Sequence, residues 1–207
     1  MLKLVKVKFN KGVGNAFLNC VRCAAFHSTS TIKPIGFRVG GDSTVVSISD
    51  SVLEDMTTFI KNIALKKYKY CGADDLVCAS AVCHSDLLLS DLLAGSGVTV
   101  DVDGVVLHST ANVPVEVIFR YSAGCYSADE NATFIRKNGY EGFVPIASRH
   151  SAVKTFTFDV SEATDTEEIF EVRIESVDDS DELVLLKQAT KFVDELCNSS
   201  KFNLVSD

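Results

Sequence analysis

The sequence predicts an α+β protein in which several short strands are combined with a few amphipathic helices. Segments near both ends of the chain alternate between apolar and polar residues, the period of a half-buried strand. Three other segments repeat apolar residues at spacings of three and four, as amphipathic helices do. The chain has 207 residues, of which 46% are hydrophobic, so it can bury a sizeable core in one or two domains.

The first predicted elements are a strand and a helix. Residues 3–9 alternate with period two, and residues 11–15 (KGVGN) combine a glycine-rich turn with Asn15, a side chain typical of helix caps. We therefore expect a helix over residues 15–26. Its expected apolar face consists of Phe17, Cys20, Val21, Ala24 and Ala25.

A second helix is predicted after two short strands. The strands, residues 35–39 and 44–48, lie on either side of a glycine-containing turn. Ser49 or Asp50 is a suitable cap for a helix that runs to Asn62. The expected apolar face of this helix consists of Val52, Leu53, Met56, Phe59, Ile60 and Ile63.

The middle and the end of the chain have different patterns. Residues 64–153 are rich in Val, Thr and turn residues, and strands are expected at 98–102, 105–108 and 115–121. After them we expect two strands and then one amphipathic helix behind a group of aspartates. The strands are residues 156–160 and 168–175, and the helix is residues 182–197. Its expected apolar face consists of Leu183, Leu186, Ala189, Phe192, Val193 and Leu196.

Charge and motifs exclude several function classes. A net charge of −8 repels nucleic acid, so we expect any contact with DNA to be indirect. No apolar run is long enough for a transmembrane helix, so we expect no membrane association. The chain has no Walker A loop, nucleophile elbow or zinc-protease motif, and its four histidines are far apart in sequence. We therefore predict no catalytic residue in this chain.

The seven cysteines indicate reduced thiols inside a cell, because they are odd in number and scattered. Cys20 and Cys23 have the C-x-x-C spacing of redox motifs, but both fall in the middle of the first predicted helix. We interpret them as packed apolar side chains, with redox chemistry as the alternative.

Cys71, Cys78, Cys83 and His84 are the best candidates for metal ligands, since zinc prefers thiolates and imidazole. Their C-x6-C-x4-C-H order lacks the closely spaced pairs of most structural zinc sites. We favour free, packed cysteines and no cofactor, and zinc binding stays open as the alternative.

Residues 12–23 (GVGNAFLNCVRC) resemble the signature G-x-G…G-N-A-L-R-R of the bacterial RNA polymerase α subunit family. The similarity includes both glycines, the asparagine and Arg22. It departs at Leu18, where the family has glycine, and at Cys23, where it has a second arginine.

Three later segments follow the order of the same family. Residues 47–57 (SISDSVLEDMT) are similar to its V-x-E-D helix start, and residues 61–66 (KNIALK) to its N-L-K step into a second domain. Residues 142–149 (GFVPIASR) are similar to its G-Y-V-P-A segment. The resemblance thus spans most of the chain.

The resemblance implies a discontinuous dimerisation domain of residues 1–63 and 154–207, interrupted by a mainly β domain of residues 64–153. The archaeal D subunit and the eukaryotic third-largest polymerase subunit are related members. The first and last helices would form the dimer interface, and internal packing is the alternative for any single residue. The dimer-interface candidates are Phe17, Phe26, Phe59, Phe192 and Leu196.

The resemblance also implies partners. A second α-like subunit, identical or related, would pair with the chain, and the β-like and β′-like large subunits would carry the catalytic magnesium. Arg22 and Asn19 are the expected contacts with the large subunits, and Pro145 and Arg149 a second contact patch. The implied function is a non-catalytic assembly scaffold, and the implied location is a bacterial or phage-infected cytoplasm or an organelle stroma. The alternative is a stand-alone zinc or redox protein.

Overall fold

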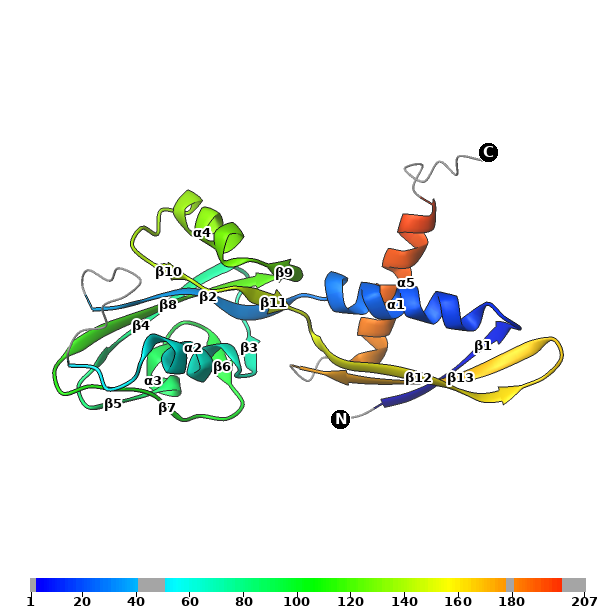
Figure 1. Cartoon of the computed structure of the whole chain (residues 1–207), viewed down its shortest axis with the longest axis horizontal. Coiled ribbons are helices and arrows are strands. Elements are labelled where there is room, and N and C mark those ends of the chain that lie inside the picture. The colour runs from blue at the N-terminus through cyan, green and yellow to red at the C-terminus, as the bar shows by residue number, and fades with distance from the viewer. Residues whose placement is uncertain (1–2, 41–50, 178–180, 199–207) are drawn as a thin grey trace. The chain divides into compact units, whose positions relative to one another are not determined.

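The computed structural model describes residues 3–40, 51–177 and 181–198, and it is a mixed α and β structure dominated by strands (Figure 1). This agrees with the predicted α+β class. The chain divides into two compact units. The terminal unit comprises Met1–Ser30 and Ser151–Asp207, and the central unit comprises Thr31–His150.

A three-stranded antiparallel sheet joins the two ends of the chain in the terminal unit. The strands are β1 (Lys3–Asn10), β12 (Val153–Ala163) and β13 (Glu167–Ser176), in the order β1-β13-β12. Val7 is paired with Phe170 across β1 and β13, and Phe158 with Val172 across β12 and β13. The predicted strands at both ends of the chain are therefore confirmed.

The two faces of this sheet differ in polarity. Phe170, Val172 and Ile174 alternate along β13 and are buried. On the other face, Lys6 lies 3.6 Å from Glu171, and Lys8 lies 2.6 Å from Glu167. Opposite charges on neighbouring strands suit a solvent-facing surface. The apolar face is the one that the helices cover.

Helix α1 (Gly14–Ser28) buries Leu18, Val21, Ala24 and Ala25 in the core of the terminal unit. The predicted cap was wrong: Val13 is the N-cap residue, no side chain caps the helix, and Asn15 is exposed. The predicted burial of Cys20 was also wrong, because it is exposed.

Two glycines at the start of α1, Gly12 before the helix and Gly14 as its first residue, have different structural roles. Gly12 has a φ of +84°, a left-handed conformation that glycine adopts without strain. Gly14 lies against the ring of Phe170, and a Cβ at this position would overlap that ring. The G-x-G pattern thus combines one turn with one close helix-to-sheet contact.

Helix α5 (Glu182–Asn198) packs against α1 and β13, and Figure 1 shows it crossing α1. Its buried residues are Leu185, Ala189 and Val193, so the predicted face was correct for two of these and missed Leu185. Asp181 accepts a hydrogen bond from the backbone N–H of Leu183 at 2.9 Å, as expected for an acidic helix start.

The central unit contains a four-stranded antiparallel sheet in the order β10-β2-β8-β4. Its strands are β2 (Thr31–Val39), β4 (Leu76–Cys83), β8 (Val113–Ser122) and β10 (Val144–Pro145). Because β2 is paired with β8 along its length, residues 31–63 belong to the central unit. The central unit thus begins at Thr31, whereas the predicted boundary followed Ile63. The strand predicted at 44–48 lies outside the described residues.

Shorter elements complete the central unit. Three strand pairs are β3 (Tyr68–Tyr70) with β6 (Val98–Val100), β5 (Asp86–Leu88) with β7 (Val105–His108), and β9 (Gly124–Tyr126) with β11 (Ser148–His150). The helices are α2 (Met56–Ala64), α3 (Leu89–Leu93) and α4 (Ala128–Lys137). In the described part of the chain, none of the helices is long and apolar enough to span a membrane.

Helix α2 begins later than predicted. Asp55, rather than Ser49 or Asp50, caps it by accepting a hydrogen bond from the backbone N–H of Thr58 at 2.6 Å. Val52 and Leu53 consequently lie before the helix. Phe59 and Ile63 on its apolar face are buried as predicted.

Replacing Gly14 by alanine is expected to lower the free energy of unfolding by about 1–3 kcal/mol, the usual effect of overpacking a core. The gain in helix propensity, about 1 kcal/mol at most, is smaller than this cost. Urea unfolding measures the change, and Asn15→Ala at the exposed neighbouring position is the control. A Gly14→Ala protein as stable as the wild type contradicts the proposed close contact with Phe170.

Candidate subunit interface

A groove lies between α1 and α5 on the helical surface of the terminal unit. It has a volume of about 550 Å³. Its lining residues are Cys20, Cys23, Ala24, His27, Phe192, Val193, Leu196 and Cys197. Among these described residues there is no Lys, Arg, Asp or Glu. Apolar surface of this kind, left open between two helices, is typical of a binding surface.

Two of the five dimer-interface candidates line this groove. Phe192 is 38% exposed and Leu196 is 43% exposed, although both belong to the predicted apolar face of the last helix. They are apolar side chains that the terminal unit leaves on its surface.

Two further candidates are half-buried beside the core of the terminal unit. Phe17 lies with its ring centroid 5.6 Å from that of Phe9, and Phe26 also packs against this core. Each retains some exposed surface. Phe17 and Phe26 are therefore at the edge of the helical surface rather than inside it.

The fifth candidate, Phe59, does not belong to this surface. It is only 1% exposed and packs edge-to-face on Phe37 in the core of the central unit, with ring centroids 5.1 Å apart. A side chain without exposed surface has nothing to offer a partner, so its assignment to a dimer interface is corrected to the internal core.

The large-subunit candidates fall in both units. Asn19 and Arg22 are exposed on α1 in the terminal unit. In the described part of the chain, the Arg22 side chain has no hydrogen bond or ion pair. Pro145 is half-buried in β10 and Arg149 is exposed in β11, both in the central unit.

The sequence did not predict that three cysteines of the groove lie on the surface. Cys20, Cys23 and Cys197 are all exposed, so the expectation that Cys20 and Cys23 pack internally was wrong. The i, i+3 spacing of Cys20 and Cys23 places them on one side of α1. The same spacing could have predicted a second apolar stripe, separate from the buried one.

The four candidate zinc ligands are not gathered into a site. Cys78 and Cys83 belong to strand β4, whereas Cys71 and His84 are exposed outside it. Burial raises the pKa of the Cys78 and Cys83 thiols, which opposes the thiolate form that zinc needs. Over residues 3–40, 51–177 and 181–198, no group of three or more ligand-type side chains is arranged to hold a metal ion.

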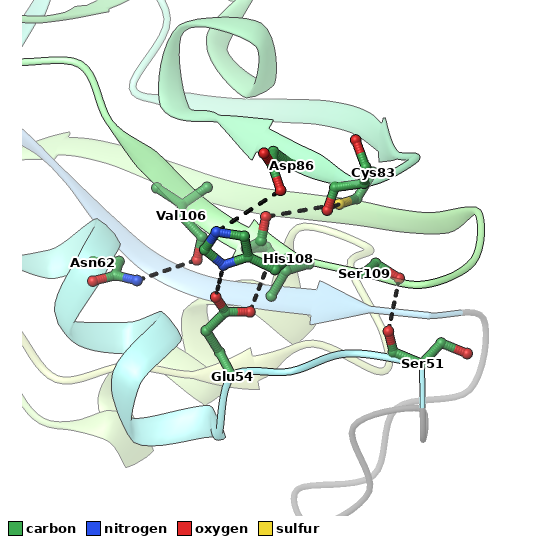
Figure 2. A network of polar contacts seen from close by, with 10 residues as sticks. Ser51, Glu54, Asn62, Cys83, Asp86, Val106, His108 and Ser109 are labelled. Atoms are coloured by element: carbon green, nitrogen blue, oxygen red, sulfur yellow. Dashed lines mark hydrogen bonds and ion pairs between the residues drawn. The ribbon is translucent and has the colours of Figure 1, made fainter.

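A polar network that the sequence did not predict lies in the central unit. Figure 2 shows His108 between Glu54 and Asp86. The ring Nδ1 of His108 forms a hydrogen bond with Oε1 of Glu54. The backbone N–H of His108 donates a hydrogen bond to Oε2 of Glu54 at 2.7 Å. Its Nε2 lies 3.8 Å from Asp86. These contacts attach the segment before α2 to strand β7.

The network shifts the acidity of both partners. The hydrogen bond to Glu54 raises the pKa of His108, helped by the charges of Glu54 and Asp86. Burial acts to raise the pKa of Glu54, but the hydrogen bonds from His108 outweigh it and lower that pKa. The nearby Cys83 thiol is fully buried and has a raised pKa, so it is not an activated nucleophile. The arrangement is suited to holding structure rather than to catalysis.

Replacing Glu54 by glutamine is expected to destabilise the protein more at about pH 6 than at about pH 9. A raised His108 pKa means that the ion pair is fully present below the ordinary histidine pKa of 6.5 and is lost as the pH rises through the folded-state value. Urea unfolding at both pH values tests this. Glu141→Gln, at an exposed site in the same unit, should show no such difference. Equal losses for Glu54→Gln at both pH values contradict the ion pair.

Comparison with known proteins finds relatives among bacterial RNA polymerase α subunits. No protein-family model matches the chain. The chain is 27% identical over 171 residues to the DNA-directed RNA polymerase subunit alpha of Leptospira biflexa serovar Patoc, in both the Ames and the Paris lines of strain Patoc 1. The aligned region is 77% of this chain and 50% of each relative, so the chain spans about half the length of the curated relatives it matches. This weak similarity supports a relation to bacterial RNA polymerase α subunits.

Proposed function

We propose that this chain is a non-catalytic α-like subunit of a DNA-dependent RNA polymerase. In this role it pairs with a second α-like subunit through the groove between α1 and α5, and it offers the Arg22 side of α1 to the large subunits. The observation that carries the proposal is an exposed apolar groove with Phe192 and Leu196 on it, in a chain similar to α subunits.

The chemistry of the groove favours a partner with the same surface. In a symmetric dimer each patch meets its own copy, so a patch without charges avoids placing like charges opposite each other. The described lining residues include no Lys, Arg, Asp or Glu side chain. Two such surfaces can therefore pack against each other without bringing like charges together.

The energies indicate how wide the interface must be. Covering the exposed parts of Phe192 and Leu196 contributes about 1 kcal/mol per side chain, hence about 4 kcal/mol for the four side chains of a symmetric pair. A micromolar dimer needs about 8 kcal/mol. The remainder has to come from neighbouring surface, and the half-buried Phe17 and Phe26 and the exposed cysteines of the groove are suited to supply it.

Arg22 lies on a different side of α1 from the groove. It follows Cys20 by two residues, and residues two apart on a helix do not face each other. Asn19 precedes Arg22 by one turn and is exposed with it. A second α-like subunit and a large subunit can therefore contact α1 at the same time. An arginine with five donors is a frequent anchor of such contacts. Pro145 and Arg149 remain the proposed second patch.

Replacing both Phe192 and Leu196 by aspartate is expected to raise the dimer dissociation constant at least about a hundredfold, because it buries unpaired charge at the interface. Sedimentation analysis over a concentration series measures the constant. Val184→Asp is the matched control, since Val184 is 48% exposed on the same helix and does not line the groove. A wild-type chain that stays monomeric, alone and in its native extract, contradicts the proposed pairing.

Replacing Arg22 by alanine is expected to weaken the recovery of large polymerase subunits about thirtyfold, the effect of removing an interface anchor. Pairing with the second α-like subunit should be unchanged. Quantitative mass spectrometry of tagged chains purified from the source cells measures both. Lys187→Ala, at an exposed site on α5, is the control. Unchanged recovery of the large subunits with Arg22→Ala would show that Arg22 is not part of the interface.

A further inference from the structure

A small pocket in the central unit has the composition of an anion site. It has a volume of about 200 Å³ and is formed by the start of β2, the end of α2 and the segment that leads into β11. The lining residues are Lys33, Pro34, Ala64, Ala147, Ser148 and Arg149. Among these described residues two are cations, one carries a hydroxyl group and none is acidic. This composition is unusual in a chain whose net charge is −8.

The fold holds the Lys33 ammonium group and the backbone of Arg149 beside the pocket. The Lys33 ammonium donates to the backbone carbonyl of Lys66, just after α2, at 3.1 Å. Arg149 is paired with Cys125 in the β9–β11 ladder, which fixes the backbone from which its side chain extends. A cation whose position is fixed before binding loses less entropy when it contacts a ligand.

The hydroxyl group of Ser148 is held from behind by two buried side chains. The Asn131 Nδ2 donates to the Ser148 Oγ at 3.0 Å, and the His150 Nε2 lies 2.8 Å from the same oxygen. His150 Nδ1 lies 3.1 Å from the carbonyl oxygen of Thr31, which only accepts, so Nδ1 carries the proton. Nε2 is therefore the acceptor for the Ser148 hydroxyl proton.

This network has a second possible state. If His150 became protonated, Nε2 would donate a hydrogen bond to the Ser148 Oγ. The Ser148 O–H group would then no longer donate to His150 and could rotate to point into the pocket. Burial, together with the positive charges of Arg120 on β8 and Lys33 on β2, lowers the pKa of His150 to about 4. The ring of Tyr126 on β9 packs edge-on against the His150 ring. At neutral pH the first state is therefore the populated one.

We propose that this pocket binds a single oxyanion, a phosphate or carboxylate group, between Lys33 and Arg149, and that the Ser148 hydroxyl group becomes a third contact when His150 is protonated. The pocket volume suits one such group rather than a whole nucleotide. The site uses none of the residues of the groove or of the Arg22 surface, but it shares Arg149 with the proposed second contact patch for the large subunits. Phosphate binding by the isolated chain tests the site separately from the proposed polymerase role.

Binding is linked to the state of His150. An anion beside Lys33 offsets part of the positive charge that opposes protonation of the ring, so the pKa of His150 rises when the pocket is filled. The Ser148 hydroxyl group, which no longer donates to His150, then donates a hydrogen bond to the anion. Anion binding should therefore take up a fraction of a proton, most clearly between about pH 4 and pH 6.5.

The test is a titration of the whole chain with inorganic phosphate at constant ionic strength, followed by heteronuclear NMR of Ser148, Arg149 and His150. Saturable shifts with a dissociation constant of about 1 mM or below are expected for such a site. Lys33→Gln combined with Arg149→Gln should weaken binding at least about tenfold, the effect of losing charge-assisted contacts. Lys137→Gln, which removes an exposed charge from the same unit outside the pocket, should not.

Two further readouts distinguish the site from general charge attraction. The midpoint of the His150 ring titration should rise with phosphate in the wild type and stay constant in the double variant. A titration with acetate in place of phosphate identifies the chemical class of the ligand. Tighter phosphate binding assigns a phosphate group, and tighter acetate binding assigns a carboxylate. Shifts that do not saturate for either anion, or that persist in the double variant, overturn the proposal.

Discussion

The pairing of β13 with both β1 and β12 is the constraint on which the terminal unit depends. The register Lys3↔Ile174 joins residues from opposite ends of the chain, and the same strand continues into the hairpin with β12. One apolar sheet face results, with Phe170 at its centre. Because Gly14 lies directly against that ring, α1 begins close to the sheet and buries one side only. The surface that remains on α1 follows from this placement.

The three sides of α1 then have three different surroundings. Leu18 and Val21 face the core, Cys20 and Cys23 line the groove with α5, and Arg22 is exposed. A helix that had only to complete a core would need one apolar stripe. The second apolar stripe and the lone arginine are understandable if other subunits cover them, which is the basis of the proposed scaffold role. The distant similarity to α subunits is an independent reason for the same proposal.

Sequence periodicity was sufficient to predict those helices and strands that are packed on one side only. The strands at both ends and the first and last helices were predicted within a few residues, because each has one buried face. Helix α4 was missed although Ser127 and Glu130 form a capping box, a signal visible in the sequence as S-x-x-E. Strand β4 was missed because its small residues do not alternate in polarity. Phe59 was misassigned because hydrophobic periodicity indicates that a residue is buried but not which core it belongs to. The Glu54–His108 contact was not predicted because these residues are too far apart in the sequence for a local pattern to reveal it.

Affinity purification of the tagged chain from its source cells, followed by mass spectrometry and an assay of DNA-dependent RNA synthesis, tests the central claim most directly. The account predicts that a second α-like chain and two large polymerase subunits are recovered, together with RNA synthesis that the isolated chain does not have. Recovery of the chain alone, as a folded monomer without large subunits, would contradict it.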